Sequence, residues 1–77
     1  EKPYDLYHTN VDGGGWINSF ATVHEAKAEA DRLQEESDRH GNWWQYRYHV
    51  FGLYGRKQYE TVSNDELVKL ARSNEQR

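Results

Sequence analysis

The sequence contains no cysteine and no long run of apolar residues. Without cysteine, neither a disulfide framework nor a thiolate metal site can form, and a reducing cytoplasm is the expected compartment. A membrane-spanning helix needs roughly 20 consecutive apolar residues, so no membrane partner is expected. A chain of 77 residues is expected to form one small domain over 1–77, with a thin core and little room for a deep substrate cavity.

The chain also has little net charge, with a formal value of only −3. This value disfavours a general binder of duplex DNA, which needs clustered Lys and Arg to contact phosphates. The charges are unevenly spread. Residues 22–40 hold six acidic and three basic side chains, so this segment carries the whole net charge.

The segment 22–40 is predicted to form an amphipathic helix. Thr22 and Glu25 match the T-x-x-E capping box. In this motif the hydroxyl and the carboxylate each accept a hydrogen bond from a backbone N–H group that would otherwise have no partner. An apolar stripe follows at helical spacing, formed by Val23, Ala26, Ala30 and Leu33. Gly41 provides a residue that can adopt the left-handed conformation after the last turn.

Strand patterns flank this helix on both sides. Tyr4 to Val11 and Trp16 to Phe20 are predicted to form a hairpin, with a loose tip over 10–15 that contains three glycines. Residues 43–51 are nearly all β formers. Their alternation places one set on the core face (Trp44, Tyr46, Tyr48, Val50) and the other set on the opposite face (Trp43, Gln45, Arg47, His49, Phe51).

The remaining chain predicts a turn over 52–55, a strand over 57–62 and a short C-terminal helix. That helix begins with the S-x-x-E pattern of Ser63 and Glu66 and extends to about Ser73. The element order is therefore ββαββα. It predicts an α+β fold with a four-stranded, mainly antiparallel sheet, one long helix packed on a face and a short C-terminal helix. The strand order stays open.

No residue pattern supports catalysis, a cofactor or a metal ion. The four histidines show no H-x-x-x-H or H-E-x-x-H spacing. The acid pairs lie on the polar side of the helix, whereas acid–base catalysis needs one carboxylate in a desolvated environment. Gly13 to Gly15 are not followed by the Lys-Ser/Thr of a phosphate loop. We therefore expect a non-enzymatic protein that needs no cofactor.

Two surfaces are candidates for binding a macromolecule. The acidic helix face, with Glu25, Glu29 and Glu36, suits a basic protein partner. The aromatic sheet face, with Trp43, Arg47 and Phe51, contains residue types that dominate binding hot spots. Such a face can also stack the bases of single-stranded nucleic acid. Alternatively, the C-terminal helix covers the aromatic sheet face. A second copy of the chain could also cover this face, and the protein would then be a homodimer.

The run Phe20-Ala21-Thr22-Val23-His24-Glu25-Ala26, followed by Ala30, Leu33 and Trp44 to Tyr48, resembles small accessory proteins of phages and mobile elements. Some of these, including anti-CRISPR and host-takeover proteins, bind and block a host machine. The resemblance implies an inhibitor of a host protein that handles nucleic acid. The SPOR peptidoglycan-binding domain also pairs an F-x-(S/T)-x-x-x-A helix with a Tyr-Arg strand. This sequence lacks the final strand of that domain.

Overall fold

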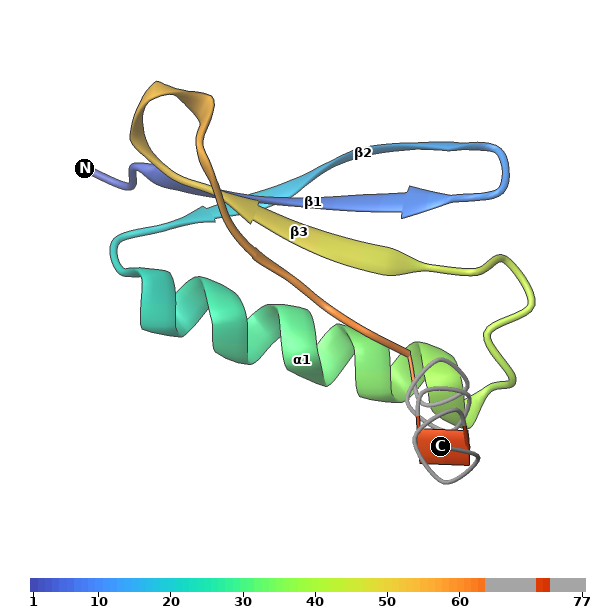
Figure 1. Ribbon diagram of the computed structural model, residues 1–77. Coiled ribbons are helices and arrows are strands. Elements are labelled where there is room, and N and C mark those ends of the chain that lie inside the picture. The colour runs from blue at the N-terminus through green and yellow to red at the C-terminus, as the bar shows by residue number, and fades with distance from the viewer. Residues whose placement is uncertain (64–70, 73–77) are drawn as a thin grey trace.

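The computed structural model describes residues 1–63 and 71–72 of the chain. Within them lie β1 (Tyr4–Asn10), β2 (Gly13–Phe20), α1 (Val23–Arg39), β3 (Arg47–Phe51) and β4 (Lys57–Glu60), with a 3₁₀ turn at Leu53–Gly55. The strands form one antiparallel sheet in the order β2-β1-β3-β4, and α1 lies along one face of it (Figure 1). The predicted α+β class and four-stranded antiparallel sheet are confirmed. The helix predicted from Ser63 to Ser73 falls mostly on 64–70 and 73, outside the described residues.

The tip of the β1–β2 hairpin is tighter than the sequence predicted. Asn10 pairs with Gly13, so only Val11 and Asp12 connect the strands, and the Asn10 side chain accepts the Asp12 amide at 2.8 Å. The prediction of a loose tip over 10–15 is therefore wrong, and the three glycines belong to β2. A Cβ atom on Gly14 would lie 2.1 Å from the carbonyl oxygen of His8, so glycine allows β1 and β2 to approach there.

The core lies between α1 and the two central strands, β1 and β3. Ala26 and Ala30 of α1 have no exposed surface, and neither do Leu6 of β1 and Val50 of β3. The predicted stripe is confirmed, since its remaining members, Val23 and Leu33, pack at the margin of this cluster. The Thr22 half of the predicted capping box is also present, because the Thr22 hydroxyl accepts a hydrogen bond from the Glu25 amide at 3.2 Å. Small alanine side chains let the helix lie close to the sheet.

A buried polar network joins α1 to the second half of the sheet. The Thr61 hydroxyl donates to the side-chain oxygen of Gln34 at 2.5 Å and accepts the Tyr48 amide at 2.9 Å. The Tyr48 hydroxyl lies 3.0 Å from the Ser37 hydroxyl. Each contact gives a buried polar group a partner, which avoids the cost of an unsatisfied group. Sequence patterns do not reveal this network, because Gln34 lies outside the predicted apolar stripe.

The third strand begins later than the sequence predicted. Residues 41–46 form a loop in which Asn42 (φ 47°) and Gln45 (φ 55°) adopt left-handed conformations. The Asn42 side chain accepts the Tyr46 amide at 2.8 Å, and the Asn42 carbonyl accepts the Gln45 amide at 3.0 Å. The prediction of a strand over 43–51 is therefore wrong for its first four residues. Trp44, predicted to be in the core, is 51% exposed.

Replacing Leu6 should strongly destabilise this core. Leu6→Ala removes a fully buried side chain, so we expect a loss of about 2–4 kcal/mol in the free energy of unfolding. Leu53→Ala is the matched control, because Leu53 is 61% exposed and its truncation should cost under about 0.5 kcal/mol. Urea denaturation followed by circular dichroism measures both variants. Equal losses would contradict the assignment of the core.

Tyr59 anchors β4 to α1 and should make folding sensitive to alkaline pH. Its hydroxyl donates to the Asp31 carboxylate, and this bond, together with burial, raises the pKa of Tyr59 from 10.0 to about 12. A raised folded-state pKa stabilises the fold below the unfolded value, and this stabilisation is lost as pH rises from 10.0 to about 12. Tyr59→Phe should therefore lose less stability than the parent across this window, as measured by urea denaturation. An equal loss in both proteins would exclude this role.

Candidate binding surfaces

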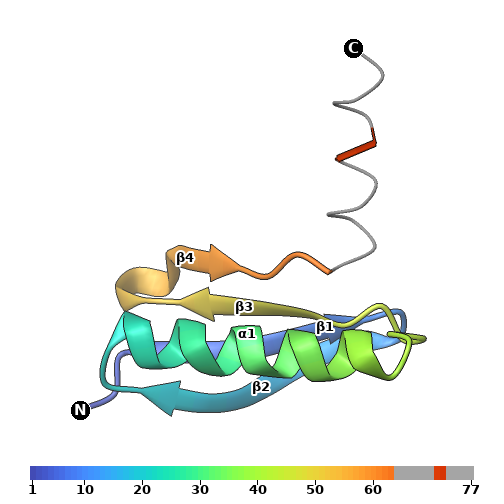
Figure 2. The ribbon, with the colours of Figure 1, turned by 90° about the horizontal axis from the view of Figure 1, so that it is seen from below.

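The open face of the sheet is built by alternate residues of the two central strands. Asp5, Tyr7 and Thr9 of β1 point away from α1, and so do Arg47, His49 and Phe51 of β3. The residues between them, such as Leu6 and Val50, fill the core. Figure 2 shows α1 lying across the other face of the sheet. In the part of the chain that the structure describes, no element covers the open face.

An apolar groove of about 890 Å³ occupies this face. Tyr7 and Phe51 form its floor, with ring centroids 5.6 Å apart and planes at 87°, an edge-to-face contact that aromatic rings favour. The turn between β3 and β4 rises on the side away from α1 (Figure 1) and brings Leu53 and Tyr54 to the edge of the groove. Tyr54 is 97% exposed and has a left-handed backbone with φ 63°.

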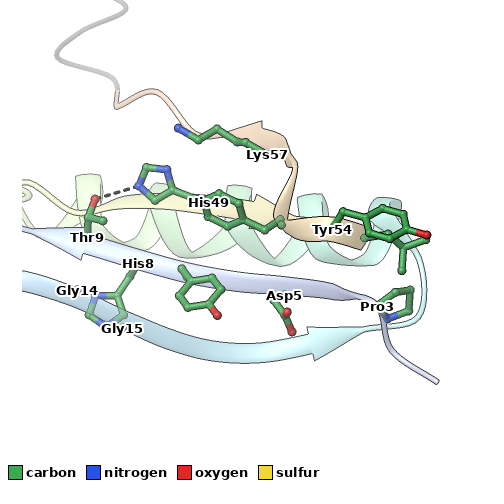
Figure 3. Close-up of a pocket in the computed structure, with 14 residues that line it drawn as sticks. Pro3, Asp5, His8, Thr9, Gly14, Gly15, His49, Tyr54 and Lys57 are labelled. Carbon is green, nitrogen blue, oxygen red and sulfur yellow. Dashed lines mark hydrogen bonds between the residues drawn. The ribbon is translucent and has the colours of Figure 1, made fainter.

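Several polar groups in and beside the groove contact one another. His49 lies between β1 and β4: its Nε2 is 3.0 Å from the Thr9 hydroxyl (Figure 3), and its Nδ1 is 2.8 Å from the Glu60 carboxylate. Lys57 donates to the same Glu60 carboxylate at 3.1 Å. The Lys57 ammonium, with a smaller contribution from His49, lowers the pKa of the Glu60 carboxyl. The groove therefore has little net charge and a mainly apolar character.

A second groove, of about 270 Å³, lies between the end of α1 and the loop 41–46. Its lining includes Glu36 of α1 and the indoles of Trp43 and Trp44. Trp43 is 85% exposed. The prediction that Trp43 shares the sheet face with Arg47 and Phe51 is wrong, because the left-handed residues of the loop turn Trp43 toward the helix end.

The acidic face of α1 is partly neutralised by its own bases. Arg32 contacts Glu29 at 2.5 Å and Glu36 at 3.2 Å, and Arg39 contacts Glu35 at 3.2 Å. These are spacings of three or four residues, which bring side chains together on a helix. Glu25 is exposed in the first turn of α1, remote from both grooves. The acidic face therefore carries less uncompensated charge than its composition suggested.

The six residues predicted for binding thus fall into three places. Arg47 and Phe51 lie on the sheet face, where Arg47 donates to the Tyr46 carbonyl at 2.7 Å. Glu36 and Trp43 meet in the second groove. Glu25 and Glu29 stay on the helix surface. Among the groove residues that the prediction missed are Tyr7, Leu53 and Tyr54. Alternation with Leu6 could have placed Tyr7 on the open face, but the β1–β3 pairing that brings it to Phe51 was not readable from the sequence.

Chemical and evolutionary comparisons add no further assignment. In residues 1–63 and 71–72, no group of three or more His, Cys, Asp or Glu side chains is arranged to hold a metal ion. The helix within these ranges is not long and apolar enough to cross a membrane. Comparisons with protein-family models, curated proteins and solved structures give no match.

The Lys57–Glu60 ion pair beside the open-face groove can be tested directly through the pKa of Glu60. Lys57→Ala removes the group that contributes most to lowering the pKa of Glu60, so we expect that pKa to rise toward 4.5, its ordinary value. Arg56→Ala is a control, since it removes an exposed neighbouring charge and should shift the pKa less. Carboxyl ¹³C NMR titration reads the value for each variant. An unchanged pKa in Lys57→Ala would show that the contact does not form.

Proposed function

We propose that this chain is a non-enzymatic binding module that holds a segment of a protein partner in the open-face groove. The observation that carries the proposal is the Tyr7–Phe51 pair, which lies on a sheet face that no described element covers. Contiguous apolar surface of this kind is typical of interaction sites. Tyrosine rings with an exposed edge also supply much contact area at a small loss of side-chain entropy.

The dimensions and charge of the groove favour an extended apolar segment. Its lining follows β1 from Asp5 to Thr9, a span of roughly 13 Å, which matches about four residues of extended chain. Lys57 and Glu60 are paired with each other, so the groove offers little net charge to a charged ligand. Apolar or aromatic side chains of the partner would pack against Tyr7, Phe51 and Leu53.

Single-stranded nucleic acid is the second candidate. Two adjacent central strands each present one ring, Tyr7 and Phe51, and such a pair can act as a stacking platform. Phosphate binding also needs available cations. Here Lys57 is bonded to Glu60, and the Asp5 carboxylate lines the same groove. These charges favour a protein segment over a polyanion.

Selection of peptides on the immobilised chain tests the proposal. A random peptide library should yield binders rich in aromatic and aliphatic residues. Phe51→Ala should weaken a selected peptide by about tenfold or more, as expected at a binding hot spot, when measured by fluorescence anisotropy. Trp43→Ala removes an exposed ring outside the groove and should leave the affinity unchanged. A library that yields no binder weakened by Phe51→Ala would overturn the proposal.

Two further measurements identify the competing occupants. Binding of a labelled oligonucleotide that weakens at the higher of two salt concentrations, and is lost in Arg47→Ala, would replace the protein partner with nucleic acid. Sedimentation that shows a dimer in the parent and a monomer in Phe51→Ala would assign the face to a second copy of the chain. The proposal expects neither result.

A further inference from the structure

The groove at the end of α1 combines exposed indoles with an acidic helix terminus. Trp43 is 85% exposed and Trp44 is 51% exposed, and both line the groove with Glu36. Large exposed aromatic rings are unusual on a protein surface, since burial of such rings normally contributes to stability. Their presence beside a carboxylate indicates a ligand that combines an aromatic-stacking surface with positive charge.

The surrounding charge is complementary to a cation. Glu36 is the one acidic side chain among the described residues that line the groove, and this lining contains no Lys or Arg. The C-terminal end of a helix also carries a partial negative charge from its carbonyl groups, so acids placed there are unfavourable on their own. A bound cation would relieve this repulsion.

Glu36 can accept such a cation without leaving a neighbour unpaired. Its present contact is Arg32 Nη1 at 3.2 Å, and Arg32 Nε is also held by Glu29 at 2.5 Å. If Glu36 turned toward an incoming group, Arg32 would keep its shorter contact. The Glu36 side chain is 54% exposed and therefore open to a partner.

Backbone hydrogen bonds fix the loop that carries the two exposed indoles. The Asn42 amide donates to the Ser37 carbonyl of α1 at 2.8 Å, and the Trp44 carbonyl accepts the Val11 amide of the hairpin tip at 2.9 Å. The Trp43 indole nitrogen would lie 3.1 Å from a Cβ atom on Gly41, so the ring rests against the helix end. Preorganised rings lose little freedom when a ligand binds.

We infer that this groove binds an arginine side chain of a basic peptide segment in a protein partner. A guanidinium is planar, so it can stack on an indole while its N–H groups donate to a carboxylate such as that of Glu36. The compact ammonium of lysine cannot do both as well. The inference stands apart from the open-face groove, because the two surfaces share no lining residue.

Indole N–H signals of the full chain test the inference, because each of its three tryptophans gives one signal in a ¹H–¹⁵N spectrum. The probe is an end-blocked tetra-arginine peptide, with tetra-glutamate as the control peptide. We expect the Trp43 and Trp44 signals to shift along one saturating curve with tetra-arginine only. Trp16, an exposed indole on β2, should not shift. Unchanged Trp43 and Trp44 signals, or equal shifts of all three, would overturn the inference.

Matched charge variants separate a specific site from general attraction. Glu36→Gln and Glu25→Gln each remove one exposed carboxylate from α1, at opposite ends of the helix. Glu36→Gln should weaken tetra-arginine binding about two- to five-fold, whereas Glu25→Gln should have little effect. If both variants weakened binding equally, the attraction would depend on net charge alone, and this result would refute a specific site. Phe51→Ala should leave tetra-arginine binding unchanged, because Phe51 lines only the open-face groove. The two proposals can therefore fail independently of each other.

Discussion

The close seating of Ala26 and Ala30 on Leu6 and Val50 is the contact on which the described fold depends. It places α1 against the two central strands and commits one face of the sheet to the core. Alternation along each strand then sends the intervening side chains to the opposite face. The exposure of the Tyr7–Phe51 pair is thus a direct consequence of helix packing on one face only. Within the described residues no second helix covers the opposite face, so these two rings form the floor of a groove.

Polar contacts decide how each surface can be used. On the sheet face, Glu60 engages both Lys57 and His49, so the groove is nearly neutral and suited to an apolar segment. At the end of α1, Glu36 lies beside two indoles in a groove whose described lining holds no Lys or Arg, which suits a cation. The two surfaces differ in chemistry and lie on different layers of the fold. One partner could contact both only by reaching around the molecule.

The sequence predicts the helix well, because Thr22, the apolar stripe and Gly41 independently indicate the same boundaries. It predicts the hairpin tip poorly, since Gly14 is needed for its contact with the His8 backbone rather than for a loose turn. The start of β3 is also missed. β propensity favours Trp43 as a strand residue, but the Asn42 hydrogen bonds turn the chain there. Candidate sites that combine distant strands, such as Tyr7 with Phe51, require the strand order, which one sequence does not reveal.

Exposure of the sheet face in the intact chain is the claim on which the proposed function rests. Line broadening of aromatic NMR signals by a soluble paramagnetic agent measures it directly, because broadening depends on how closely the agent approaches each ring. Tyr7 is 36% exposed and Tyr48 is 6% exposed, so Tyr7 should broaden strongly and Tyr48 weakly, with Phe51 following Tyr7. Protection of Tyr7 and Phe51 equal to that of Tyr48 would show that the face is already covered, and would contradict the account.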